Sequence, residues 1–278
     1  RLEERAMPSI ADRIDRAEGL MRARRFDMAV EELAAIDPGE DLELRRQWHH
    51  VYGMALFRTR VRYLDAARVL HESALLRGDH EIEDAFHSAR ALSRADKDPR
   101  GVRAYRRFAV RYPRSKRAPE ARFLAAWLEI RLGRSNGEKQ MQRLVTGKNQ
   151  VWGRWRRSAL WELGFRAFET RRYSRAAHFL VQYTKLASSG MDRARGHYWL
   201  GRARRRGPKA VAAYRDAIAV EPLHWYAVLA AQRLRRIGVA PPEPFEAALS
   251  PASTEPPAQE PRLPQTVLLY RSLGLDRD

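Results

Sequence analysis

The 278-residue chain contains no cysteine and no long apolar run, and both absences narrow its function. Without cysteine there is no disulfide, no thiolate zinc site and no cysteine nucleophile. The longest uninterrupted apolar run, Trp225 to Ala231, is far shorter than the ~20 residues that a membrane-spanning helix needs. A glycine-rich phosphate loop and a Gly-x-Ser-x-Gly pattern are also missing, so neither nucleotide binding through such a loop nor α/β-hydrolase chemistry is supported.

Acidic residues and lysines are scarce beside the arginines. The chain has 53 Lys and Arg against 34 Asp and Glu, a net charge of +19, and only six of the basic residues are lysines. Such a bias can reflect codon usage, because Arg and Lys serve equally on many solvated faces, and it names no partner by itself. It does favour anionic polymers as ligands, meaning nucleic acid, anionic lipid or cell-wall glycan peptide.

The apolar residues recur at spacings of three and four rather than two, which predicts helices. Around a break at residues 170–174, apolar residues at this spacing are Leu160, Leu163, Ala167, Ala176, Phe179, Leu180 and Tyr183. Similar breaks recur at residues 24–27, 61–64, 98–101, 134–137 and 206–209. A period of about 34 to 40 residues with two helices per unit predicts an all-α fold, an α-solenoid of about six tetratricopeptide-like hairpins.

One repeat unit shows the tetratricopeptide pattern position for position. It reads Leu160-x-x-Leu163-Gly164, followed by Tyr173 and Ala176. The small residues let the two helices of a hairpin approach closely, and the aromatic residue at the turn covers the groove between them. Other units keep parts of the pattern: Phe26 with Ala29, Tyr63 with Ala66, and Leu200-Gly201 with Ala213.

The composition changes abruptly after Val239. Residues 240–264 hold eight of the 15 prolines, which excludes helix and predicts an extended proline-rich linker. Residues 265–278 are expected to begin a further helical domain that is cut short. The chain opens at Arg1 without Met or a secretory signal, so we also expect a fragment of a longer protein. The predicted domains are therefore a superhelix over 1–239, a linker over 240–264 and a truncated domain over 265–278.

Tryptophan and arginine interleave at Trp152, Arg154, Trp155 and Arg156, which are the candidate ligand-binding residues. Such a patch can stack on sugar or base rings and hold an anion with guanidinium donors. The alternative, which helical spacing favours, is that the two tryptophans belong to the buried stripe of a helix whose arginines face solvent.

Other polar constellations give weaker signals. His80, Asp84 and His87 would share one helical face and could form a metal stripe, but a polar face with scattered histidines is the commoner explanation. Glu81 with Asp84 could be cast as glycosidase carboxylates, although solvated helix faces account for them more simply. For His224-Trp225-Tyr226, a buried helical stripe is again favoured over ligand binding. We therefore predict no catalytic residue, no metal site and no cofactor in this chain.

Three stretches near the end of the repeat region follow one another in a recognisable order. They are Arg195 to Ala203 with Tyr-Trp-Leu-Gly-Arg-Ala, Ala210 to Tyr214, and His224 to Leu234 with Leu-Ala-Ala-Gln-Arg-Leu. Together they resemble the superhelical region of bacterial soluble lytic murein transglycosylases, just before its connection to the catalytic domain. Residues 112–134 and 265–275 look similar more weakly. The resemblance implies that a lysozyme-like domain outside this chain would use one Glu as general acid and then as base.

One departure from that family decides catalysis. Its catalytic domain carries a Glu-Ser at the start of the acid helix and a downstream Gly-Leu-Met-Gln. Here Glu72-Ser73 is the only Glu-Ser, it lies inside a predicted repeat hairpin, and no Gly-Leu-Met-Gln follows. No catalytic glutamate can be carried over, so we expect that this chain alone does not cleave glycan.

Three functions stay open at this point. The first is a non-catalytic superhelix of a periplasmic or cell-envelope lytic transglycosylase-like protein, which positions or embraces peptidoglycan for a catalytic domain. The second is a tetratricopeptide scaffold that grips a peptide of a partner protein in its groove. Nucleic-acid binding is the least favoured, because arginine is spread over all hairpins and no recognised module is present.

Overall fold

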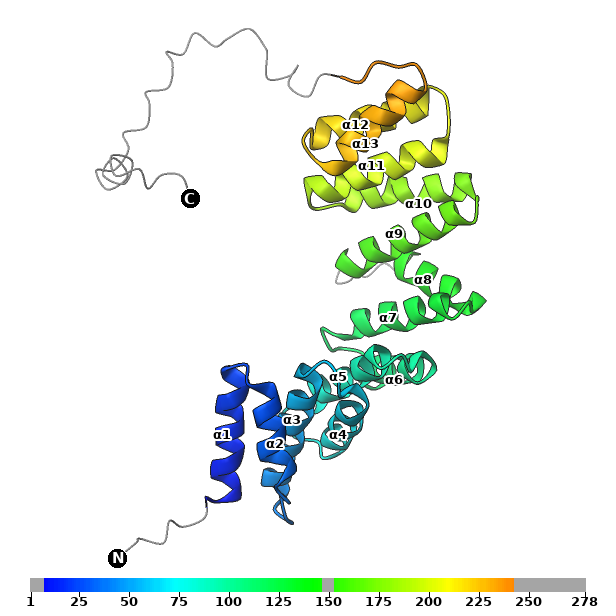
Figure 1. Ribbon diagram of the computed structural model, residues 1–278. Coiled ribbons are helices and arrows are strands. Elements are labelled where there is room, and N and C mark those ends of the chain that lie inside the picture. The colour runs from blue at the N-terminus through cyan, green and yellow to red at the C-terminus, as the bar shows by residue number, and fades with distance from the viewer. Residues whose placement is uncertain (1–7, 147–152, 243–278) are drawn as a thin grey trace, which may run out of the picture.

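The computed structural model describes residues 8–146 and 153–242 (Figure 1). Within these residues the chain forms thirteen α-helices and no strand. The helices are α1 (Ile10–Arg22), α2 (Phe26–Ala34), α3 (Leu42–Arg58), α4 (Tyr63–Leu75), α5 (Glu81–Arg94), α6 (Asp98–Arg111), α7 (Ala118–Arg131), α8 (Ser135–Thr146), α9 (Gly153–Glu169), α10 (Tyr173–Leu186), α11 (Gly190–Arg204), α12 (Pro208–Val220) and α13 (Trp225–Arg236).

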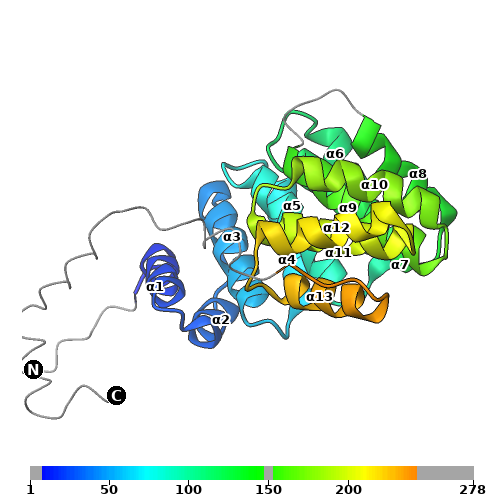
Figure 2. The same cartoon turned by 90° about the horizontal axis from the view of Figure 1, so that it is seen from above.

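The first twelve helices form six antiparallel hairpins, α1/α2 through α11/α12, and α13 packs on the last of them. Each helix contacts mainly its neighbours in the sequence, and first helices of adjacent hairpins also meet. Figure 1 shows the hairpins following one another from α1 at the lower left to α12 and α13 at the top. Seen from above, the later hairpins lie in layers and α1 stands to one side (Figure 2). The predicted all-α solenoid of about six hairpins is confirmed.

The apolar core is a chain of five clusters rather than one centre. They span α1 to α5, α5 to α7, α7 to α10, α9 to α12, and α11 to α13. Successive clusters share helices, so burial is continuous along the stack, as expected of a repeat protein whose units contact only their neighbours. The seven apolar residues predicted to line the α9/α10 hairpin are all buried.

Small residues hold the hairpins close together, as their positions in the repeat pattern predict. A methyl group built on Gly164 of α9 would lie 3.1 Å from Cγ of Leu180 on α10. The small residues that the pattern places on the second helices are fully buried: Ala29, Ala66, Ala176 and Ala213. The close approach that the Leu-Gly pattern predicts is therefore present.

The turn inside each hairpin contains a residue with positive φ: Arg24, Arg60, Asp96, Gly133, Arg171 and Arg205. Several first helices end with a backbone hydrogen bond that reaches back five residues, such as Lys97 N–H to the Leu92 carbonyl at 3.0 Å. Two predicted breaks are misplaced, because residues 98–101 and 134–137 lie in the first turns of α6 and, mostly, α8. The break at residues 98–101 is predicted from Pro99, but this proline lies in the first turn of α6, where proline is well tolerated.

Helix α13 is the last helix among the described residues, and residues 239–242 that follow it are not helical. The rest of the predicted proline-rich linker, and the whole predicted domain at 265–278, lie outside the described residues. Among the helices that are described, none combines the length and the apolar character needed to cross a membrane.

Candidate functional site

Of the four residues predicted to bind ligand, Trp152 lies outside the described residues and the other three occupy the first turn of α9. Trp155 is half-buried, and its ring centre lies 5.1 Å from that of Phe123. Arg154 is exposed, with its guanidinium 5.1 Å from the Trp155 ring centre. Arg156 is half-buried, and its Nε has no hydrogen-bond partner among the described residues. Packing against Phe123 explains why Trp155 is here, but it leaves the Nε of Arg156 without a partner among the described residues. Ligand binding at these residues stays a prediction.

The segment at the start of α13 does not form the expected buried stripe throughout. His224 caps the helix, because its Nδ1 accepts the backbone N–H of Tyr226 at 3.3 Å. Trp225 is 64% exposed, so the prediction is wrong for this residue. The helix turns Ala227 and Ala230 toward the core instead, and that phase directs Trp225 outward.

Asp84 is fully buried, which corrects the expectation of a solvated carboxylate. One carboxylate oxygen accepts a hydrogen bond from Nδ1 of His50 at 2.8 Å, and the other accepts one from the Ser73 hydroxyl at 2.7 Å. The ring of His80 stacks on His50 with 3.6 Å between ring centres. Asp84 therefore ties α3, α4 and α5 together and forms no metal stripe with His80 and His87. Within the described part of the chain no metal-binding group of three such side chains converges.

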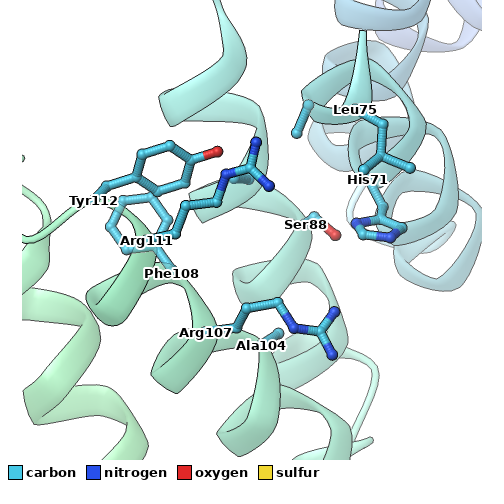
Figure 3. A pocket seen from close by; sticks show the side chains of 10 residues that line it. His71, Leu75, Ser88, Ala104, Arg107, Phe108, Arg111 and Tyr112 are labelled. Carbon is cyan, nitrogen blue, oxygen red and sulfur yellow. The ribbon is translucent and has the colours of Figure 1, made fainter. Parts of the chain in front are cut away.

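A groove runs between α4 and α6, the second helices of adjacent hairpins, over side chains of α5. We call it the α4–α6 groove. It contains two adjoining cavities of about 580 and 70 Å³. The residues that line both cavities are His71, Ser88, Ala104 and Arg107. Figure 3 looks into the smaller cavity, where His71 and Leu75 of α4 face Arg107 and Arg111 of α6 across the opening.

The groove combines an apolar floor with a basic wall. Its small and apolar floor residues are Ala67, Ala74, Ala85, Leu92 and Ala104. On α4, Leu64 and Leu75 are 48% and 58% exposed. The basic wall is on α6, where the spacing places Arg100, Arg103, Arg107 and Arg111 along one side of the helix.

Three of the wall arginines have no counter-charge within the part of the chain that the structure describes. Arg100, Arg103 and Arg107 are exposed, and their guanidinium groups make no ion pair or hydrogen bond with any described residue. Asp65 is the only carboxylate among the described residues that line the groove, and it pairs with Arg62 at 2.8 Å. The groove therefore carries uncompensated positive charge beside apolar surface.

The narrow end of the groove is fixed by an internal network. The Tyr112 hydroxyl donates to Glu81 at 2.7 Å, and Arg111 donates to the same carboxylate oxygen at 3.0 Å. The hydrogen bond from Tyr112 lowers the pKa of Glu81. Burial, together with that bond, raises the pKa of Tyr112 to about 12. Tyr112 thus stays protonated at neutral pH and holds the Glu81 carboxylate in place.

The sequence contains a signal for this groove that only the alignment of two repeats brings out. On α4 the stripe is Leu64, Arg68, His71 and Leu75, and on α6 it is Arg100, Ala104, Arg107 and Arg111. Each residue of the second stripe follows its counterpart by 36 residues, which is one solenoid repeat. Equivalent positions in adjacent repeats lie side by side, so the two stripes had to face one common groove.

The fold is similar to those of other helical-repeat chains. It matches the apo form of the quorum sensor NprR from B. thuringiensis with a TM-score of 0.54 and 13% identity, over 98% of this chain and 80% of that one. It also matches BtubC (BKLC) from P. vanneervenii with a TM-score of 0.50 and 13% identity, over 93% of this chain and 99% of that one. No family model and no curated protein matches the sequence.

These likenesses show the fold alone. At 13% identity they carry no residue from NprR or BtubC to this chain. They agree with the helical-repeat architecture of the described residues, and function has to be argued from the surfaces that this architecture presents.

Proposed function

We propose that this chain is a helical-repeat scaffold that binds an acidic peptide segment of a partner protein in the α4–α6 groove. The observation that carries the proposal is the pairing of apolar surface with unpaired arginines on α6. Guanidinium groups bind carboxylates in a forked geometry, and apolar anchors supply affinity, so an acidic segment with apolar side chains complements both. The helical-repeat likeness to NprR and BtubC is compatible with this role.

The dimensions of the groove suit a short segment. Each stripe spans eleven residue steps, or about 16 Å of helix. An extended peptide would place about five residues along that length, and a helical one about eleven. Leu64 and Leu75 lie near the two ends of the α4 stripe, where they offer apolar contacts to both ends of the segment.

The polar groups on the groove floor favour binding over catalysis. Ser88 is buried, and its hydroxyl donates to the carbonyl of Ala67 at 2.8 Å. It is therefore used inside the fold rather than aimed at a bound molecule. The arginines of the wall are suited to holding carboxylates, because a guanidinium presents its N–H donors in a fixed fork that matches two carboxylate oxygens.

A peptide titration tests this proposal. The probe is a fluorescein-labelled peptide with Leu at positions 1, 5, 8 and 12 and Glu between them, followed by fluorescence anisotropy. The Arg103→Glu/Arg107→Glu variant reverses two wall charges and is expected to lose at least about tenfold in affinity, since hydrogen bonds to charged groups are each worth more than 1 kcal/mol. The matched control, Arg193→Glu/Arg215→Glu, makes the same charge change on exposed residues of α11 and α12.

The control is expected to bind within about threefold of the parent, as distant surface charges contribute little at physiological salt. Equal losses in both variants would mean that net charge alone attracts the peptide. Unchanged affinity in the groove variant would remove the groove from the interaction. Substituting Lys for every Glu of the probe should abolish binding to the parent chain.

A second candidate is the superhelical region of a periplasmic or cell-envelope lytic transglycosylase-like protein, which would position peptidoglycan for a catalytic domain elsewhere. It is supported by the three stretches that resemble that family, which correspond to the consecutive helices α11, α12 and α13. Their shared residues are largely core residues, such as Leu200, Ala213 and Leu234. The resemblance therefore concerns how the last helices pack, and it assigns no binding residue.

Two observations test the second candidate. The gene downstream of this segment should encode a Glu-Ser and a Gly-Leu-Met-Gln, and their absence would reject the assignment. The purified chain should also co-sediment with peptidoglycan sacculi at moderate salt. If the chain stays in the supernatant while the acidic peptide binds, the peptidoglycan function is rejected and the scaffold function is supported.

A further inference from the structure

An arginine recurs at the same place in four successive repeats, near the end of the first helix of each hairpin. The residues are Arg94, Arg131, Arg166 and Arg202, at separations of 37, 35 and 36 residues. In the two middle repeats the charge is neutralised by the preceding hairpin. Arg131 donates to Asp98 at 2.7 Å, and Arg166 donates to Glu138 at 3.3 Å. At these positions the arginine is part of the fold.

The first of these repeats lacks the acid. Arg94 of α5 faces Tyr63, which is the first residue of α4, whereas Arg131 of α7 faces Asp98, the first residue of α6. Arg94 donates to the Tyr63 hydroxyl at 3.2 Å, and its guanidinium carbon lies 5.8 Å from the ring centres of both Tyr63 and Phe57. Aromatic faces hold this guanidinium, and no carboxylate of the described residues forms an ion pair with it.

Around Arg94 lies a cavity of about 420 Å³, which we call the N-terminal socket. Its arginines come from the first three hairpins and from the residue before α7: Arg24, Arg58, Arg60, Arg90, Arg94 and Arg117. No carboxylate is among the described residues that line it. The guanidinium groups of four of the six, Arg24, Arg58, Arg60 and Arg90, make no ion pair or hydrogen bond with the described chain. Arg117 pairs with Glu83 at 3.2 Å.

The backbone at the socket is unfavourable for two of these arginines. Arg24 and Arg60 occupy hairpin turns with φ of 58° and 66°. This left-handed region is unfavourable for an L-residue with a side chain, whereas glycine adopts it freely. Gly133 fills the corresponding turn of the α7/α8 hairpin. The turns at Arg24 and Arg60 therefore present guanidinium groups at positions where the positive φ by itself favours glycine.

We propose that the N-terminal socket binds the phosphates of a small di- or triphosphate, either free or carried by a nucleoside. Four unpaired guanidiniums exceed what one carboxylate can neutralise, while each phosphate brings up to two charges and several acceptor oxygens. The cavity has the volume of a small-molecule site. Phe26 also lines it and gives a ring face on which a nucleobase can stack.

The socket is distinct from the α4–α6 groove. Helix α5 directs Ala85, Ser88 and Leu92 to the groove, and His87, Arg90 and Arg94 to the socket. The two sets lie on different sides of the helix, because residues two apart on a helix are separated by about 200°. Peptide binding and phosphate binding are therefore separable, and failure of one leaves the other standing.

Calorimetric titration of the full chain with sodium tripolyphosphate, ATP without magnesium, and inorganic phosphate tests the proposal. Tripolyphosphate is expected to bind saturably and at least about tenfold more tightly than phosphate, because it engages several guanidiniums at once. ATP binding more tightly than tripolyphosphate would assign the site to a nucleotide, and equal affinity would assign it to the free polyphosphate.

Two variants locate the binding. Arg60→Glu/Arg90→Glu reverses two socket charges, and Tyr63→Asp introduces the acid that the next repeat carries at Asp98. The second variant should fold, since the chain already contains that pair one repeat further on. Both are expected to lose at least about tenfold in tripolyphosphate affinity, and the Arg193→Glu/Arg215→Glu control should stay within about threefold.

A smaller cavity of about 240 Å³ at Arg202 is the C-terminal counterpart of the socket. Tyr173, the first residue of α10, lines it, as Tyr63, the first residue of α4, lines the socket. A weaker second binding step that persists in both variants is expected from it. Absence of saturable binding to the parent chain would overturn the proposal. So would an equal loss in the control, or displacement of tripolyphosphate by duplex DNA with the same affinity in parent and socket variants.

Discussion

Replacing Gly201 by alanine tests the close packing of the hairpins at one defined contact. Gly201 lies within α11 and faces Tyr214 of α12. A methyl group on Gly201 would lie 2.6 Å from Cε1 and 2.7 Å from Cδ1 of that ring. Ordinary contacts begin near 3.4 Å, so the ring would have to move by about 0.8 Å. Tyr214 is 3% exposed and belongs to the core cluster of α11 to α13, which leaves little room for that movement.

The size of the stability change expected for Gly201→Ala follows from comparison with Gly19, a glycine whose added methyl group would meet almost no neighbour. A methyl group on Gly19, within α1, would meet only the guanidinium of Arg22, at 3.9 Å. Gly19→Ala should therefore stabilise the chain by about 1 kcal/mol through helix propensity. Gly201→Ala gains the same propensity but overpacks the core, which costs about 1–3 kcal/mol. The two variants should differ by that overpacking, or roughly 2 to 12 °C in Tm.

The assay is thermal and urea unfolding of the parent and both variants, followed by circular dichroism at 222 nm. We expect Gly19→Ala to be the most stable of the three, with Gly201→Ala well below it. If Gly201→Ala equalled Gly19→Ala in stability, the contact between α11 and α12 would be looser than described, and the packing role of the Leu-Gly pattern would be refuted.

Two further substitutions test buried polar groups. Asp84→Ala removes the acceptor of His50 and Ser73 and should lower the free energy of unfolding by about 3–5 kcal/mol, against about 1 kcal/mol for Ser73→Ala; equal losses in urea would contradict the network. Burial raises the pKa of Glu162, and nearby Glu169 adds to this, so the ionised carboxylate costs stability above that pKa. Glu162→Gln should therefore raise Tm at pH 7 but not at pH 3, where Glu162 is protonated whether folded or unfolded, and an equal gain at both pH values would contradict the burial.

The hairpins could be predicted because their signals are local. The spacing of Leu160, Leu163 and Ala167 defines one helix face without knowledge of any distant residue. The break at residues 98–101 is predicted wrongly, because Pro99 and Gly101 indicate a turn in the sequence but lie in the first turn of α6. There proline needs no hydrogen-bond partner, and Gly101 lets Leu128 approach.

The groove and the buried carboxylate depend on contacts between repeats. Asp84 meets His50, which is 34 residues earlier, and no local pattern distinguishes it from a solvated acid on the same helix. The arginine wall is likewise visible only when α4 is placed beside α6. The periodicity was sufficient to align Leu64 with Arg100, but the sequence does not show which arginines find partners, and that decides which surface stays charged.

Hydrogen–deuterium exchange with and without the Leu/Glu peptide tests whether the peptide binds in the α4–α6 groove, because the protected amides locate the bound segment on the chain. We expect slower amide exchange in residues 64–75 and 100–111, on the two helices that flank the α4–α6 groove, and unchanged exchange in α9 to α13. Protection confined to α9 to α13, or spread evenly over all hairpins, would contradict it.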